Sequence, residues 1–228
     1  MKRWRLAAAG VIVVSCVACT TYDFHDSAPI FSAVLTGSDP YIMTSAPGTA
    51  SFVSRVPDNN TREMFWPSDS PPVSNSESCA TWATETNANV QQGAALRIRH
   101  VTGGYQLVTV TKNIWGYAYW IFNFHVWDPT RTPPYTQVGQ VDLASEFEAA
   151  ANEAFPPPWY MCARVSGSTL QFKAWRLGQS EPAYGDPHYG AAVTLPAGWD
   201  YPGATGWYIG HAPTNNEASF TDLVTRSP

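Results

Sequence analysis

The sequence predicts an all-β protein, and three observations support this prediction. Apolar and polar residues alternate in short runs along much of the chain, as strands with one buried face require. The 16 Gly and 19 Pro residues interrupt these runs and favour turns over long helices. Aromatic residues make up 14% of the chain, and many of them fall inside the predicted strands.

The first residues are typical of an export signal. Lys2, Arg3 and Arg5 precede a short apolar run, residues 6–14. This run is too short to cross a bilayer, which takes about 20 residues. We therefore expect a signal peptide over residues 1–18, a tether over 19–30 and an extracytoplasmic protein.

Two modes of processing stay open. The run Val13-Val14-Ser15-Cys16 is typical of a bacterial lipobox, which would place a lipid on Cys16. The residues before Cys19 fit a simple signal-peptidase site or a weaker lipobox. The mature protein is then either secreted or held at the bacterial cell envelope by a lipid anchor, its only expected link to a membrane.

The charge of the chain argues against a nucleic-acid partner. Removal of the three leader cations would leave 10 basic and 18 acidic residues, a formal net charge of -8. Nucleic-acid binding relies on a basic surface that neutralises phosphates.

Cys79 and Cys162 are the two cysteines in the body of the chain, and an exported protein with two cysteines is expected to form one disulfide. The alternative is two buried free thiols. Beyond the leader, the sequence has no CxxC pair and no Cys/His cluster, so we expect no zinc site.

The strands are expected in one domain over residues 31–228. Residues 31–52 alternate apolar and small polar residues, and a second series of strands begins near Cys79. In residues 93–99, Leu96 and Ile98 are predicted to share one face, with Arg97 and Arg99 on the other. Gly103-Gly104 predicts a hairpin turn, and Val108 and Val110 then alternate with threonines.

Residues 117–127 form the longest aromatic run. Here Phe122, Phe124 and Val126 are predicted to face inward, and Asn123, His125 and Trp127 to face outward. One short inserted helix is expected near 143–155, because Leu143, Phe147 and Ala151 recur at helical spacing among Ala and Glu residues. Three prolines, 156–158, would end it.

The last third returns to strands. In residues 170–175, Leu170, Phe172 and Ala174 are expected on one face, and Gln171, Lys173 and Trp175 on the other. Glu181-Pro182, the Gly-rich run 203–210 and the run Phe220-Thr221-Asp222-Leu223 follow.

This block, residues 159–225, resembles the closing strands of concanavalin A-like (LamG-like) domains, and the chain looks most like exported (lipo)proteins of actinobacteria. Tyr184 departs from the pattern, because related sequences often have a Trp after the Glu-Pro pair. The resemblance implies a two-sheet antiparallel jelly-roll sandwich. It transfers no catalytic residue, because such sandwiches carry many functions.

The sequence gives weak support for catalysis. It leaves open whether the protein is an enzyme and favours a non-catalytic protein. A glycoside hydrolase needs two carboxylates across its substrate. The nearest acidic pair, Glu146 and Glu148, falls on the predicted helix, where residues two apart diverge. His211 and the other histidines lack a Gly-x-Ser-x-Gly elbow.

We expect no cofactor, with calcium as the alternative. Loops rich in Asp and Asn supply the oxygen ligands that calcium prefers. Two clusters have this composition, and each is also an ordinary turn: Asp58, Asn59 and Asn60, and Asn215, Asn216 and Glu217.

The leading hypothesis is an exported, non-catalytic module that binds a polysaccharide or glycoconjugate. Tryptophan rings stack on the apolar faces of sugars, while polar groups hydrogen-bond the hydroxyls. The candidate ligand-binding residues are Arg97, Asn123, His125, Trp127, Lys173 and Trp175.

Three alternatives stay open. The same aromatic face can bury against an envelope protein, which would make the chain an interaction or structural module. Trp127 and Trp175 can instead belong to the core under loops, with the charged groups simply solvated. A glycoside hydrolase is the third alternative.

Overall fold

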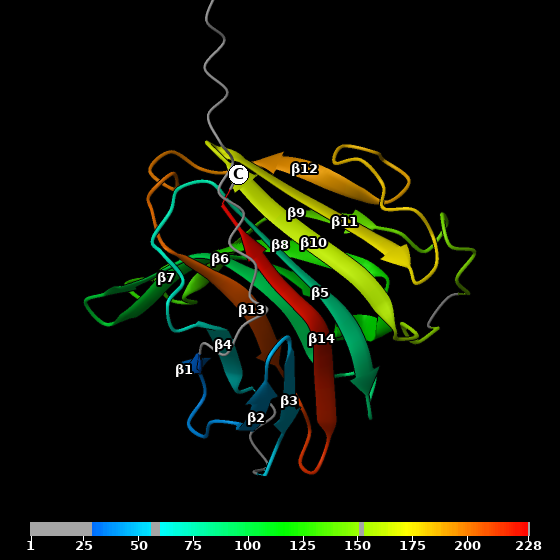
Figure 1. Ribbon diagram of the computed structural model, residues 1–228, viewed down its shortest axis with the longest axis horizontal. Coiled ribbons are helices and arrows are strands. Elements are labelled where there is room, and N and C mark those ends of the chain that lie inside the picture. Colours follow the sequence, from blue (N-terminus) through cyan, green and yellow to red (C-terminus); the bar gives the residue numbers. More distant parts are fainter. Residues whose placement is uncertain (1–28, 56–59, 151–152, 228) are drawn as a thin grey trace, which may run out of the picture.

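The computed structural model describes residues 29–55, 60–150 and 153–227, and within them the chain forms two antiparallel seven-stranded sheets stacked as a sandwich (Figure 1). The predicted all-β, two-sheet jelly-roll fold is confirmed. The predicted leader, tether and lipidation sites, through residue 28, lie outside the described residues. The described part of the chain has no helix with the length and hydropathy of a membrane span.

Sheet A has the strand order β1-β4-β13-β6-β7-β8-β9. Its strands are β1 (Ile30–Thr36), β4 (Arg62–Pro67), β13 (Ala204–Gly210), β6 (Gln91–Val101), β7 (Gly104–Lys112), β8 (Ile121–Trp127) and β9 (Tyr135–Asp142). One 3-10 turn, η1 (Trp115–Tyr117), joins β7 to β8.

Sheet B has the strand order β12-β11-β10-β5-β14-β3-β2. Its strands are β12 (Gly190–Thr194), β11 (Thr169–Arg176), β10 (Trp159–Ser166), β5 (Ser76–Glu85), β14 (Glu217–Arg226), β3 (Thr49–Val53) and β2 (Ile42–Ala46). At one end of this sheet Arg226 lies opposite Glu77, and towards the other Trp82 lies opposite Trp159.

The main core lies between the sheets. The rings of Phe122 from sheet A and Phe172 from sheet B are 4.8 Å apart. Phe124, Val126, Leu170 and Ala174 join the same cluster. The predicted inward faces of residues 121–127 and 170–175 are therefore confirmed.

The prediction that Leu96 and Ile98 share a face is wrong. The register of β6 shifts between Leu96 and Arg99, and Arg97 has a φ of 54°. This bulge inserts a residue, so Leu96 packs in the main core and Ile98 in a cluster on the outer face of sheet A.

The predicted helix near 143–155 is also wrong. Its described residues, 143–150 and 153–155, form turns and irregular chain. One i to i+4 hydrogen bond forms, from the Phe147 N–H to the Leu143 carbonyl, and Glu148 then takes a φ of 55°. Tertiary packing overrides helix propensity here, because Phe147 packs on Trp159, with ring centroids 4.6 Å apart, and Phe155 enters the core.

The predicted disulfide and hairpin are both confirmed. Cys79 and Cys162 are bonded and lie directly opposite each other on β5 and β10. The β6–β7 turn uses Gly103 and Gly104, with φ of 90° and 148°, which glycine adopts without steric cost.

Candidate functional site

The six candidate ligand-binding residues fall in three separate places. Asn123, His125 and Trp127 lie on β8, with their side chains on the outer face of sheet A. Lys173 and Trp175 lie on β11, on the outer face of sheet B. Arg97 is buried. The expectation of one shared surface is therefore wrong, because the two outer faces point away from each other.

The outer face of sheet A is concave. Strands β4 and β8 are separated by three others, a span of about 19 Å in a flat sheet. The guanidinium of Arg62 on β4 nevertheless lies 5.9 Å from the Trp127 ring on β8. The rings of Trp66 and Tyr105, three strand spacings apart, are also only 6.1 Å from each other. Side chains from β4, β7 and β8 therefore converge over this face, and Met64, Leu107 and Tyr208 on it are fully buried, as on the hollow side of a curved sheet.

This concave face is filled by its own side chains. Trp127 is only 3% exposed, and its indole N–H donates to the Thr109 hydroxyl at 2.9 Å. His125 packs beside Trp127 and Tyr135. Burial and the nearby Arg62 lower the pKa of His125 to about 4, so this imidazole is neutral at pH 7.

Asn123 has a supporting role at the edge of the same face. Its amide donates to the side-chain oxygen of Asn113 at 3.1 Å, and the Asn113 amide donates to the carbonyls of Trp115 and Ala118. This network holds the β7–β8 loop. Trp115 and Tyr117 on that loop are 86% and 65% exposed.

The outer face of sheet B is covered by the loop that follows β11. The Lys173 ammonium donates to Glu181 at 2.5 Å and to the Pro182 carbonyl at 2.9 Å. The ring of Tyr184 lies 4.2 Å from that ammonium. Trp175 is 7% exposed and stacks on Tyr160 with ring centroids 5.4 Å apart. These contacts bury both candidate residues.

Arg97 joins three segments of the fold. Its guanidinium group donates to the backbone carbonyls of Ser74 at 2.8 Å, Gly167 at 2.6 Å and Trp199. Each of these carbonyls lies in a connection between strands. Buried carbonyls need such partners, so Arg97 acts in the structure as a hydrogen-bonding hub.

The calcium alternative receives little support from the described residues. Asp58 and Asn59 lie outside them. Asn216 accepts a hydrogen bond from the Thr86 hydroxyl at 3.0 Å, and Asn215 has the left-handed φ of a turn residue, 63°. In the described ranges, the one group of potential ligands is Glu77, Cys79 and Cys162, whose sulfurs form the disulfide.

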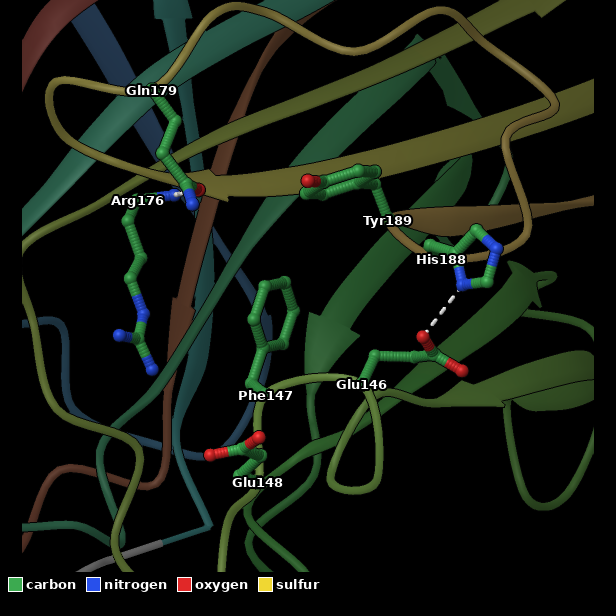
Figure 2. Close-up of a pocket in the computed structure, with 7 residues that line it drawn as sticks. All are labelled: Glu146, Phe147, Glu148, Arg176, Gln179, His188 and Tyr189. Carbon is green, nitrogen blue, oxygen red and sulfur yellow. Dashed lines mark hydrogen bonds and ion pairs between the residues drawn. The ribbon is translucent and has the colours of Figure 1, made fainter.

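An open pocket of about 410 Å³ lies where the 143–149 turn meets the end of β11 and the β11–β12 loop. We call it the loop-end pocket. Figure 2 shows Arg176 and Gln179 on one side of Phe147, and His188 paired with Glu146 on the other. Its lining residues are Glu146, Phe147, Glu148, Arg176, Gln179, His188 and Tyr189.

Charged and aromatic groups both line this pocket. The rings of Phe147 and Tyr189 are 6.0 Å apart. His188 Nδ1 lies 2.6 Å from a Glu146 carboxylate oxygen, and this contact raises the pKa of His188. The two strand connections on either side are thus joined at the surface by the contact between His188 and Glu146.

The sequence patterns do not predict this pocket. They place Glu146 and Glu148 on a helix and assign no role to Arg176, Gln179 or Tyr189. One signal was available. The connections 143–158 and 177–189 are the two longest between strands in the part of the chain described, and long loops in compact domains are often functional.

The fold is similar to those of several solved structures. CBM66, a carbohydrate-binding module from Bacillus subtilis, has a TM-score of 0.50 at 10% identity, with 86% of this chain and 95% of that chain covered. The CBM2 module of the evolved Dit protein of Lactobacillus casei BL23 phage J-1 has a TM-score of 0.53 at 13% identity, with 91% and 94% covered.

The exoplasmic/lumenal domain of VIP36, in a form bound to Ca²⁺ and Man3GlcNAc, has a TM-score of 0.50 at 8% identity, with 87% of this chain and 83% of that chain covered. No family model and no curated protein sequence matches this chain. At these identities, the structural similarities show the jelly-roll fold alone.

Proposed function

We propose that this protein binds glycans, and that the loop-end pocket is its binding site. The observation that carries this proposal is the chemistry of the pocket wall. Aromatic rings from Phe147 and Tyr189 lie beside Arg176, Gln179 and Glu148 in an open cavity. Rings of this kind pack against the C–H faces of sugars, and the polar groups match their hydroxyls.

The jelly-roll likenesses support the same class of ligand. Two of the similar structures are named as carbohydrate-binding modules, and a third was solved with Man3GlcNAc bound. We further propose that the protein acts outside the cytoplasm, at the cell envelope or beyond it, because its first residues are typical of an export signal.

The proposed function is non-catalytic. Glu146 and Glu148 both line the pocket, which is the feature that would favour a glycoside hydrolase. In Figure 2, however, the Glu146 carboxylate points to His188, and the Glu148 carboxylate points away from both Glu146 and His188. A pair that cleaves a glycosidic bond must instead face a common substrate.

A protein partner is the second candidate function, and the β7–β8 loop favours it. Trp115 is 86% exposed, and Tyr117 is 65% exposed. Exposed aromatic side chains commonly anchor protein interfaces. The test of the glycan proposal separates the two candidates.

The test is a steric block of the pocket. Gln179 is exposed and lines the pocket, so Gln179→Trp should fill it without disturbing the core. On an array of bacterial and plant glycans, we expect the unmodified protein to bind, Gln179→Trp to bind at least about tenfold more weakly, and the neighbouring control Ser180→Trp to bind normally.

Equal binding by both variants would contradict the pocket assignment. Absence of binding to every glycan would contradict the proposed function, and crosslinking to envelope proteins through the β7–β8 loop would follow. Release of reducing sugar from a bound glycan would show that the protein is a hydrolase.

A further inference from the structure

Arg176 occupies a defined position in the loop-end pocket. It is the last residue of β11 and lies directly opposite Trp159 on β10. Its guanidinium carbon lies 5.5 Å from the Trp159 ring and 5.9 Å from the Phe147 ring. Cation–π contacts with two rings restrict the orientation of this long side chain. The guanidinium is therefore partly ordered before any ligand arrives.

Arg176 also has no carboxylate partner among the described residues. Two other cations of sheet B are paired, since Lys173 contacts Glu181 and Arg226 contacts Glu77, and a third, Arg164, donates to the side-chain oxygen of Gln171. In the pocket, Glu146 is occupied by His188. Glu148 lines the same cavity, yet no ion pair joins it to Arg176. An exposed guanidinium that stacks on rings but lacks an anion is suited to bind one.

Gln179 supplies a second donor beside Arg176. The backbone N–H of Arg176 donates to the Gln179 side-chain oxygen at 3.1 Å. This bond leaves the NH₂ end of the amide as the group available to a ligand. Figure 2 shows both residues on the same side of Phe147. Guanidinium and amide donors together fit the two oxygens of a carboxylate.

From these contacts we infer that the loop-end pocket binds an acidic sugar, one that carries a carboxylate, such as a uronic acid residue of a polysaccharide. The carboxylate lies against Arg176 and Gln179, and the sugar ring packs on Phe147 and Tyr189. This inference rests on the proposed function, because it names the class of glycan that the same pocket takes.

Glu148 makes the inference sharply testable. Its negative charge lies in the same pocket and opposes a ligand carboxylate, but it does not oppose a neutral sugar. Removal of this charge should therefore strengthen the binding of an acidic glycan alone. A pocket that selects neutral sugars would respond differently, because Glu148 would then act as an acceptor for hydroxyl groups.

The experiment compares matched ligands by calorimetry. An array of uronate, sialate and neutral glycans first identifies a bound glycan, and an acidic one is then compared with its methyl ester, which has the same ring but no charge. We expect Arg176→Gln to weaken binding of the acid at least about tenfold and of the ester less than about twofold. Glu148→Gln should strengthen binding of the acid several-fold.

Two further variants serve as controls. Arg176→Lys keeps the charge but loses the two-pronged donor, so it should restore only part of the affinity for the acid. Arg55→Gln removes an exposed arginine outside the pocket and should change nothing. Circular dichroism and thermal unfolding establish that each variant is folded.

The outcomes distinguish this inference from the proposed function. Binding confined to neutral glycans, or equal affinity for acid and ester, overturns the acidic-sugar inference while glycan binding stands. Loss of affinity for both ligands in Arg176→Gln also overturns it. Binding to no glycan overturns the proposed function itself.

Discussion

His125 illustrates how much of a side chain's chemistry depends on what surrounds it. On the sequence it was a polar group facing outward, available to a ligand. In the structure it is packed against Trp127 and Tyr135 on a concave face, and its Nδ1 has no hydrogen-bond partner. Burial next to Arg62 lowers its pKa to about 4, so charging it in the folded state is unfavourable.

This pKa predicts an acid sensitivity. The unfolded chain takes up a proton on His125 near pH 6.5, whereas the folded chain does so only near pH 4. The free energy of unfolding should therefore be highest above pH 6.5 and fall as the pH drops towards 4. The contribution of His125 is at most about 3.5 kcal/mol, given about 1.4 kcal/mol per pKa unit.

Urea unfolding at pH 7 and pH 4 measures this effect. The difference in unfolding free energy between the two pH values should be smaller in His125→Gln than in the unmodified protein. His100→Gln, which changes an exposed histidine on the same sheet, should keep the full difference. An unchanged pH dependence in His125→Gln would show that His125 is already solvated in the folded state.

Among the strands, the Cys79–Cys162 bond links β5 to β10 near the middle of sheet B. It closes a loop with a sequence separation of 83 residues, which contains most of sheet A. The unfolded chain therefore loses much of its freedom when the bond is present. The chain-entropy model gives a stabilisation of about 4–5 kcal/mol for a loop of this length.

The paired substitution Cys79→Ala and Cys162→Ala should lower the free energy of unfolding by about that amount, measured by urea denaturation. Ser78 and Ala163 are the pair next to the two cysteines in the register of β5 and β10. The backbone pairing of these strands therefore remains when the cysteines are replaced. A variant with unchanged stability would mean that the unfolded chain is already restricted without the bond.

The strands also show what the sequence could predict. Alternation placed Phe122, Phe124, Leu170 and Phe172 inside, because each strand needs one buried face. Alternation does not reveal which sheet a strand joins. Trp127 and Trp175 were therefore assigned to one surface although they lie on opposite faces of the sandwich.

Local patterns failed for a related reason in two other places. The bulge at Arg97 reverses the alternation of β6, and it is stabilised by carbonyls far away in the sequence. The segment 143–155 has helical composition, but its aromatic residues are drawn to Trp120 and Trp159. One wall of the loop-end pocket belongs to that segment, so a helix assignment concealed the pocket.

The whole molecule contains three clusters of buried hydrophobic residues in its described part. The largest lies between the sheets, and smaller ones lie on the outer faces of sheet A and sheet B. Trp127 belongs to the cluster on sheet A and Trp175 to the one on sheet B. Both outer clusters are built on strands whose other face forms the central core, so none of the three is an independent unit.

We therefore expect one cooperative unfolding transition. Tryptophan fluorescence and far-ultraviolet circular dichroism should give the same urea midpoint. Trp127→Phe removes the buried tryptophan of the cluster on sheet A, where Trp66 remains, and Trp175→Phe removes that of the cluster on sheet B. The midpoints by the two methods should still coincide in each variant. Separate transitions would show that an outer cluster melts independently of the central core.

The register of β14 has a practical consequence for handling the protein. Arg226 lies opposite Glu77 on β5. Arg176 lies opposite Trp159 on β10, which in turn lies opposite Trp82 on β5, so these three residues form a second row across the sheet. These rows are roughly 17 Å apart along β5, given the rise per strand residue. Attachment to a sensor surface beyond Arg226 should therefore leave the loop-end pocket open to dissolved polysaccharide, whereas attachment through the exposed residue Gln179 of the β11–β12 loop would obstruct it.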